Sequence, residues 1–176
     1  MTEYVILVSA DDQVLGRMEK MEAHQKGVLH RAFSVFLFNE RGETLLQQRA
    51  ASKYHSPLLW TNTCCSHPRE GESVLEAAQR RVREELGIDP RDIQDLMPAF
   101  HFTYRAEFDN NLIEHELDHV VIGRYAGACA LDPEEVASVR WVSMPELLAD
   151  VARNPEHYTA WFKIILDEYV KHLPNG

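Results

Sequence analysis

One short segment of the sequence brings a thiol close to an imidazole. Residues 60–68 read Trp-Thr-Asn-Thr-Cys-Cys-Ser-His-Pro, so Cys65 precedes His67 by two positions. A cysteine and a histidine at this spacing can bind a metal together, can act as a nucleophile with its partner, or can fill a buried position without doing chemistry. The residues alone leave these three interpretations open.

A second segment concentrates carboxylates. Residues 112–122 read Leu-Ile-Glu-His-Glu-Leu-Asp-His-Val-Val-Ile. In a strand, alternate side chains point to the same face, so Glu114, Glu116 and Asp118 would share one face. Like charges side by side on a strand repel each other. Either the strand is a solvated edge, or a divalent cation binds two of the carboxylates and recruits imidazoles from elsewhere in the fold.

The stretch that follows the cysteines predicts a helix with clear start and stop signals. Ser73, followed three residues later by Glu76, forms a capping box, and Gly87 is a typical C-cap. The apolar residues recur at helical spacing: Leu75, Ala78, Val82 and Leu86. Arg81 and Glu85 are four residues apart and share a face, where the simplest interpretation is an ion pair exposed to solvent.

The other elements that must position these residues are mostly strands. Apolar or alternating runs predict strands at residues 4–9, 33–38, 44–48, 99–107, 112–125 and 136–142. The second and third of these predict a hairpin. Two helices follow, one from Pro145 and one over residues 160–172, while residues 53–72 lack periodicity and predict a long functional loop. Because strands outnumber helices without alternating regularly, the expected fold class is α+β, with a mixed sheet in a layered domain.

Composition excludes several classes of function. The 176 residues carry 18 Lys and Arg against 28 Asp and Glu, a net charge of −10, which argues against nucleic acid as a partner. No apolar run approaches the roughly 20 residues of a membrane helix, and the start lacks the basic region of a signal peptide. Three cysteines make a poor disulfide framework, so we expect a reducing, cytoplasmic setting. No repeat or linker divides the chain, which predicts one domain over residues 1–176.

The loop and helix around residues 66–88 resemble the Nudix box. This signature reads Gly, five residues, Glu, seven residues, then Arg-Glu-apolar-x-Glu-Glu-x-Gly-apolar, and the positions that match are Glu72, Arg80, Val82, Glu84, Glu85, Gly87 and Ile88. Ser66 replaces the first Gly, and Arg81 replaces the first Glu of the Arg-Glu pair. Nudix hydrolases hold Mg²⁺ with these glutamates. Arg81 removes one ligand, which should weaken hydrolysis, and its guanidinium can bind a diphosphate instead.

Nearly the whole chain resembles the type 1 isopentenyl-diphosphate isomerases of the Nudix superfamily. Several unconnected motifs carry the resemblance: Glu19-Lys20, His24, residues 30–34, Arg49-Ala50, Ser52-Lys53, residues 60–62, Cys65-x-His67-Pro68, the altered Nudix box, Phe102, Tyr104, residues 114–116 and Trp161. The resemblance implies a Nudix-like α/β/α layered sandwich with a mixed sheet flanked by helices. It also implies interconversion of isopentenyl and dimethylallyl diphosphate in isoprenoid biosynthesis, through a tertiary carbocation that is formed by protonation and deprotonated on the opposite face.

The resemblance implies a role for each candidate residue. Cys65 would be the base, and Glu116 the acid, assisted by Tyr104. A metal site would hold Mn²⁺ or Mg²⁺, and would also accept Zn²⁺, with five ligands: His24, His30, His67, Glu114 and Glu116. A second Mg²⁺, held by Glu85 and the Cys65 carbonyl, would bridge the diphosphate. The remaining substrate-binding residues would be Lys20, Arg49, Lys53 and Arg81 for the diphosphate and Trp161 over the carbocation.

Two other functions compete with isomerisation. One is a Nudix-type diphosphate hydrolase, against which Arg81 argues. The other is a non-catalytic metal-binding or diphosphate-binding module, which would have no need of the Cys65 thiol together with Tyr104 and Glu116. On the expected function the partner is a small isoprenoid diphosphate, with no nucleic acid, membrane or obligate protein partner.

Overall fold

The structure is a computed structural model that describes residues 2–53, 56–108 and 110–171. Within these ranges nine strands form one sheet. The strands are β1 (Tyr4–Val8), β2 (Val14–Glu19), β3 (His30–Phe38), β4 (Glu43–Arg49), β5 (Trp60–Thr61), β6 (Cys64–Ser66), β7 (Gln94–Glu107), β8 (Ile113–Arg124) and β9 (Val136–Ser143). The helices are α1 (Lys20–Lys26), α2 (Val74–Leu86), α3 (Met144–Arg153) and α4 (Ala160–Lys171), with single 3-10 turns at Pro90–Asp92 and Pro155–His157.

Strand β3 is the centre of the sheet. It pairs antiparallel with β1, β4 and β6, and parallel with β8, while β7 pairs antiparallel with β8 and β9 with β4. One parallel pair among antiparallel ones makes the sheet mixed, as predicted. The β3–β8 register starts at His30 opposite Glu116, and the β3–β6 register places Ser34 opposite Cys65. The topology therefore sets an imidazole, a carboxylate and a thiol on neighbouring strands.

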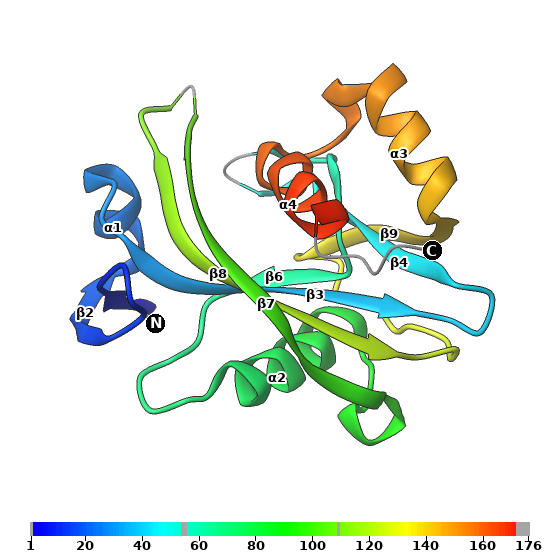
Figure 1. The fold of residues 1–176 in the computed structure, drawn as a ribbon, viewed down its shortest axis with the longest axis horizontal. Coiled ribbons are helices and arrows are strands. Elements are labelled where there is room, and N and C mark those ends of the chain that lie inside the picture. Colours follow the sequence, from blue (N-terminus) through cyan, green and yellow to red (C-terminus); the bar gives the residue numbers. More distant parts are fainter. Residues whose placement is uncertain (1, 54–55, 109, 172–176) are drawn as a thin grey trace.

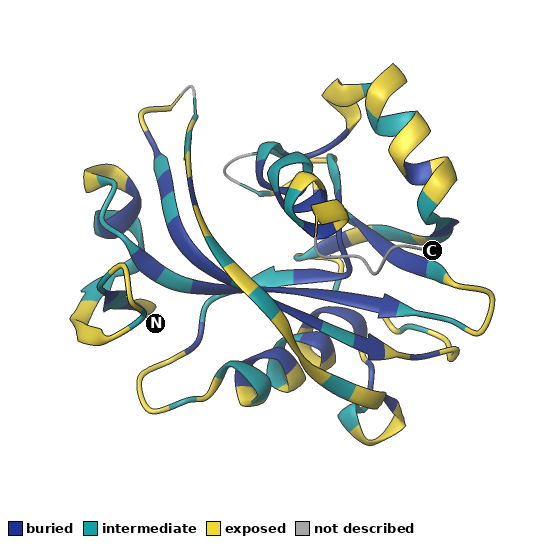
Figure 2. Cartoon of the chain, viewed as in Figure 1, coloured by how far each residue is buried: buried dark blue, intermediate teal, exposed yellow. Residues whose placement is uncertain are grey.

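Helices cover both faces of the sheet (Figure 1). On one face α2 buries Ala78, Val82 and Leu86 in a cluster that includes Phe33 and Val35 of β3. On the other face α3 and α4 contribute to a second cluster, which includes Phe36, Leu46, Leu147, Phe162 and Ile165. Figure 2 shows the buried residues along the central strands, between these helices. The α+β class and the α/β/α layering are confirmed.

Helix α2 has the ends that its sequence predicts. The Ser73 hydroxyl accepts a hydrogen bond from the Glu76 N–H at 3.1 Å, and the Glu76 carboxylate accepts one from the Ser73 N–H at 3.0 Å. Gly87 ends the helix at a φ of 64°, and a Cβ there would lie 2.6 Å from the carbonyl oxygen of Ala130. Glycine is required twice at this position, for the left-handed backbone and for the close approach.

Two regions differ from the sequence expectation. The predicted loop at residues 53–72 contains β5 and β6, whose few residues give no periodic signal. The strand β2 and the helix α1 were not predicted. Strand β2 is mostly exposed, so it has no alternating apolar pattern, and α1 has seven residues, shorter than the window of about 11 residues in which a helical period can be recognised. The predicted end of the last helix at His172 lies outside the described residues. Among the helices in the described ranges, none has the length and apolar character to cross a membrane.

Candidate active site

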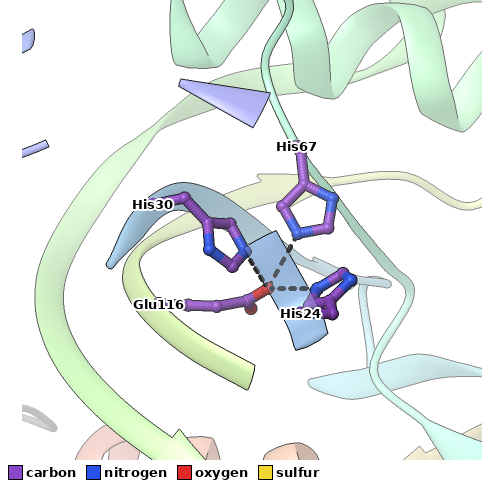
Figure 3. Close-up of side chains that lie close together, drawn as sticks. All are labelled: His24, His30, His67 and Glu116. Carbon is purple, nitrogen blue, oxygen red and sulfur yellow. Dashed lines mark hydrogen bonds and ion pairs between the residues drawn. The ribbon is translucent and has the colours of Figure 1, made fainter. Parts of the chain in front are cut away.

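Three histidines surround one carboxylate oxygen (Figure 3). His24 comes from α1, His30 from the first position of β3, His67 from the turn after β6 and Glu116 from β8. The Glu116 Oε2 atom lies 2.9 Å from His30 Nε2, 2.7 Å from His67 Nε2 and 3.9 Å from His24 Nε2. One potential ligand atom from each of the four residues lies within 4.8 Å of the other three.

The protein alone does not satisfy this cluster. Both ring nitrogens of His24 are buried and have no hydrogen-bond partner among the described residues. The Nδ1 of His30 lies 2.9 Å from the Val28 carbonyl, so it carries a proton, and the Nε2 faces Glu116 at 2.9 Å. Burial lowers the pKa of His30, but the hydrogen bond with Glu116 outweighs it and raises this pKa overall, so a metal would take the place of the proton on Nε2. Burial lowers the pKa of His67 to about 4, which keeps that ring neutral. Nitrogen lone pairs that converge on an anionic oxygen fit a divalent cation, so this cluster is a candidate metal site.

The carboxylates of β8 are buried, which excludes a solvated edge strand. Glu114, Glu116 and Asp118 are 7%, 5% and 1% exposed, because β8 lies between β3 and β7. Burial and the neighbouring Glu116 charge raise the pKa of Glu114 well above its usual range. Burial acts in the same direction on Glu116, but the attraction of the three imidazoles that face this carboxylate, His67 first, outweighs it and holds the pKa of Glu116 well below its usual range.

Tyr104 connects the two glutamates. It lies opposite Glu116 in the β7–β8 register, and its hydroxyl is 2.6 Å from Glu116 Oε1 and 3.0 Å from Glu114 Oε1. Burial raises the pKa of Tyr104 well above its usual value, so the group is a neutral hydroxyl. Glu114 is outside the group of four converging ligand atoms, and its predicted role as a fifth metal ligand stays a prediction.

The Cys65 thiol lies on the same side of the sheet. Its Sγ donates a hydrogen bond to the Asn62 side-chain oxygen at 2.9 Å and lies 3.4 Å from the Ser34 hydroxyl. Burial, and then the Asp118 charge, raise the pKa of Cys65 to about 12. The protein groups alone therefore keep Cys65 as a neutral thiol, and the lowered pKa expected of a catalytic base depends on charges that a metal or substrate would bring.

One pocket gathers the predicted residues. Its lining includes twelve of the thirteen candidates, and His30 lies in the cluster beside it. Arg81 and Glu85 do not form the solvent-exposed pair of the simplest interpretation: their side chains are 15% and 6% exposed, with Arg81 Nη2 2.5 Å from Glu85 Oε2. The guanidinium of Arg49 lies over the Trp161 ring, 5.0 Å from its centroid.

Sequence reasoning missed several polar residues of this region. Glu3 and Glu135 line the pocket, where Glu3 pairs with Lys20 at 3.0 Å and Glu135 pairs with Lys53. Neither carboxylate belongs to a motif, so no sequence signal distinguished them from surface charges. Asn62, which contacts the thiol, lies in the 60–68 segment, but the sequence alone predicted no role for it.

Comparison with known proteins first identifies the class of protein to which the chain belongs. The NUDIX domain family matches residues 28–162. The fold is that of DR0079 from Deinococcus radiodurans, with a TM-score of 0.76 and 21% identity over 94% of this chain and 98% of that one. It is also that of the MutT protein of Methanosarcina mazei Go1, with a TM-score of 0.63 and 21% identity over 81% of this chain and 94% of that one. The chain belongs to the NUDIX domain family.

Relatives of higher identity narrow this class. The isopentenyl-diphosphate Delta-isomerase of Serratia proteamaculans is 49% identical over 168 residues, which cover 96% of this chain and 92% of the relative. The protein of the same name from Burkholderia multivorans is 48% identical over 167 residues, covering 95% and 93%. Within the NUDIX family the chain is therefore a member of the isopentenyl-diphosphate Delta-isomerases.

Proposed function

We infer that this protein is an isopentenyl-diphosphate Delta-isomerase, which interconverts isopentenyl and dimethylallyl diphosphate in isoprenoid biosynthesis. The observation that carries the inference is the identity of almost one half to isomerases over nearly their full length. The geometry supports it, because a thiol, a tyrosine hydroxyl and a carboxylate that the reaction needs all line one pocket. A pure binding module has no use for that combination.

The two proposed proton-transfer groups occupy separate rows of one sheet face. His30 and Ser34 are four residues apart on β3, so their side chains point to the same face. His30 is paired with Glu116 of β8 and Ser34 with Cys65 of β6. Four residues of strand span about 13 Å between backbone positions, and the side chains at both positions extend into this space. We propose that a five-carbon olefin lies between them, is protonated from the Tyr104–Glu116 side and loses a proton to the Cys65 thiolate, the form that the charges of a bound metal and substrate would favour.

Tyr104 resolves a difficulty in the acid role. A carboxylate that binds a cation is harder to protonate, so Glu116 is a poor ligand and acid at once. The Tyr104 hydroxyl contacts both Glu116 and Glu114, and we propose that it gives its proton to the olefin and takes a replacement from Glu114, whose raised pKa lets this carboxyl hold a proton. Trp161, which lines the same pocket, would face the positive charge that develops on the tertiary carbon.

The other end of the pocket is built for a diphosphate. Four cations line it, and we propose that they bind the phosphate oxygens: Lys20, Arg49, Lys53 and Arg81. Glu85 is buried beside Arg81 and would hold a Mg²⁺ together with the Cys65 carbonyl. Bound there, Mg²⁺ would neutralise diphosphate charge, while in the histidine cluster Mn²⁺, Mg²⁺ or Zn²⁺, with Glu114 as a further ligand, would hold the Glu116 carboxylate in place.

Two broader proposals follow from the same structure. All of β1–β9 belong to one sheet, which supports a single domain over residues 1–176. The three cysteines are free thiols, which supports a reducing, cytoplasmic setting.

Proton NMR of isopentenyl diphosphate with the protein and Mg²⁺ in D₂O tests the function. Isomerisation by protonation predicts dimethylallyl diphosphate that carries solvent deuterium, with no phosphate released. Rapid release of phosphate would favour a diphosphate hydrolase, against which the pairing of Arg81 with Glu85 argues, since that arginine stands where the Nudix box has a glutamate. Product without deuterium would contradict the protonation route.

A further inference from the structure

Asn62 lies between β5 and β6, is fully buried and does not line the pocket. Its side-chain amide makes four hydrogen bonds. The nitrogen donates to the carbonyls of Val35 and Cys64, each at 3.0 Å. The oxygen accepts from the Thr61 hydroxyl and from the Cys65 thiol, each at 2.9 Å. All the usual donor and acceptor positions of the amide are occupied.

These partners fix the orientation of the amide. Backbone carbonyls only accept, so the NH₂ group must face Val35 and Cys64. A flipped amide would set its oxygen against two buried carbonyl oxygens, and unsatisfied buried groups are costly. The amide oxygen of Asn62 therefore faces the Cys65 sulfur.

The second polar neighbour of the sulfur, Ser34, does not donate a proton to it, so the thiol proton still faces an acceptor. The Ser34 hydroxyl donates to Asp118 Oδ2 at 2.7 Å, which commits its only proton, and it lies 3.4 Å from Cys65 Sγ. Ser34 and Asn62 are thus both acceptors for the thiol, with the shorter contact to Asn62, and the Trp161 side chain is a third polar neighbour of the sulfur. With its proton directed at Asn62, the sulfur turns its remaining surface toward the pocket that Cys65 lines.

The same amide oxygen is tied to helix α4, which carries Trp161. The Thr61 hydroxyl that donates to Asn62 accepts from the Thr159 hydroxyl at 3.3 Å, and Thr159 caps the helix by accepting from the Phe162 N–H at 3.2 Å. Thr61 and Thr159 are 2% and 0% exposed. Figure 1 shows α4 beside the segment of β5 and β6. A buried chain of hydrogen bonds therefore runs from the thiol to the start of this helix.

We propose that Asn62 is a positioning residue for the isomerisation, whose amide oxygen aims the Cys65 thiol and, through Thr61 and Thr159, fixes the sulfur relative to Trp161. The proposal rests on the proposed role of Cys65 as the base. Because Asn62 does not reach the pocket, its contribution falls on the chemical step and not on substrate binding. A misplacement of about 1 Å can cost about 100-fold in rate.

The S–H stretching band in infrared or Raman spectra tests the geometry without activity. The difference between wild-type and Cys65→Ser spectra isolates the Cys65 band, which is expected at a lower frequency than a thiol without a partner. In Asn62→Ala the band should shift upward. A Cys65 band at the free-thiol frequency in the wild type overturns the proposal, whether or not the variant folds.

Kinetics tests the consequence against a matched control. Thr63 is also fully buried, and its hydroxyl donates to Leu45 and accepts from Leu37 without contacting Cys65. Asn62→Ala should lower kcat about 10- to 100-fold with KM within about threefold of wild type. Thr63→Val should lose thermal stability while keeping kcat. Equal kcat in the two variants, or a change confined to KM, contradicts the positioning role. Full activity in Cys65→Ala would instead overturn the proposed role of Cys65 as the base, and leave the S–H result standing.

Discussion

The two halves of the pocket are held together in different ways. Around Cys65 the protein satisfies most of its own polar groups: Asn62 makes four hydrogen bonds, and Ser34 links the thiol to Asp118, of which one buried oxygen, Oδ1, has no hydrogen-bond partner among the described residues. Around Glu116 it does not, because His24 keeps two buried nitrogens without a partner in the described part of the chain. The first half is preorganised by the fold alone, whereas the second needs an added charge to be stable.

The largest effect should come from removing one group in each half. We predict that Cys65→Ala and Glu116→Gln each lower isomerisation by at least about 10³-fold, as expected for loss of a general base or acid. Progress is followed by proton NMR, and circular dichroism checks the fold. Cys129→Ala is the control, since Cys129 is a thiol outside the pocket. Turnover near the wild-type rate in either variant would remove that residue from its role.

Lowering the pH should have the next largest effect. Of the two halves, the one around Glu116 contains an imidazole with a strongly shifted pKa. The pKa of His67 is about 4 in the folded protein and about 6.5 when unfolded, so the unfolded chain binds more protons between these values. In the metal-free protein this imidazole alone should therefore remove about 3 kcal/mol of stability as the pH falls from 7 to 4.

Urea unfolding across this pH range measures that loss. His67→Gln removes the titrating ring, so its stability should fall less steeply over the same interval. Parallel pH profiles for the wild type and His67→Gln would show that the imidazole is not responsible.

Adding a cation should stabilise the half that lacks internal partners. At a concentration 100 times its Kd, a cation bound to the folded state contributes about 2.7 kcal/mol, which raises Tm by about 5–10 °C for a chain of this size. Thermal melts with Mn²⁺ and with a chelator measure the difference. His24→Ala should abolish the rise. His115→Ala should keep it, because His115 bonds to the Gly27 carbonyl, away from the cluster. An equal rise in both variants would place the cation elsewhere.

The smallest effect should come from a substitution at the diphosphate end of the pocket, where several cationic side chains would bind the same phosphates. Arg81→Met should raise KM about tenfold with little change in kcat, because it removes one of four cationic groups and no group of the proton transfer. Arg83→Met is the control, since Arg83 lies on the same helix, is 62% exposed and pairs with Asp89. Initial rates measured over a range of substrate concentrations give kcat and KM for both variants. A loss in kcat alone would move Arg81 from binding to chemistry.

The sequence predicts the elements whose signals are local. The capping box of α2 and the alternating carboxylates of β8 appear in the structure as expected, because cap residues and strand periodicity act within one element. Strand β2 and helix α1 were not predicted, because β2 is exposed and α1 is too short for its apolar period to be recognised.

The site could not be assembled from spacing alone. Its four converging ligands come from one helix, two strands and the loop after β6, and only the resemblance to a family connected them. Asn62, Glu3 and Glu135 were missed because their importance lies in a partner distant in sequence or in the direction of one amide, neither of which a pattern encodes. The plain interpretation of Arg81 and Glu85 failed for the same reason: helical spacing predicts the pair but not its burial.

A crystal structure of the Cys65→Ala protein with isopentenyl diphosphate, Mg²⁺ and Mn²⁺ tests the central claim most directly. The account predicts the diphosphate among Lys20, Arg49, Lys53 and Arg81, and the five-carbon chain between residue 65 and the Tyr104 hydroxyl. A hydrocarbon chain bound away from the space between those two side chains would contradict it.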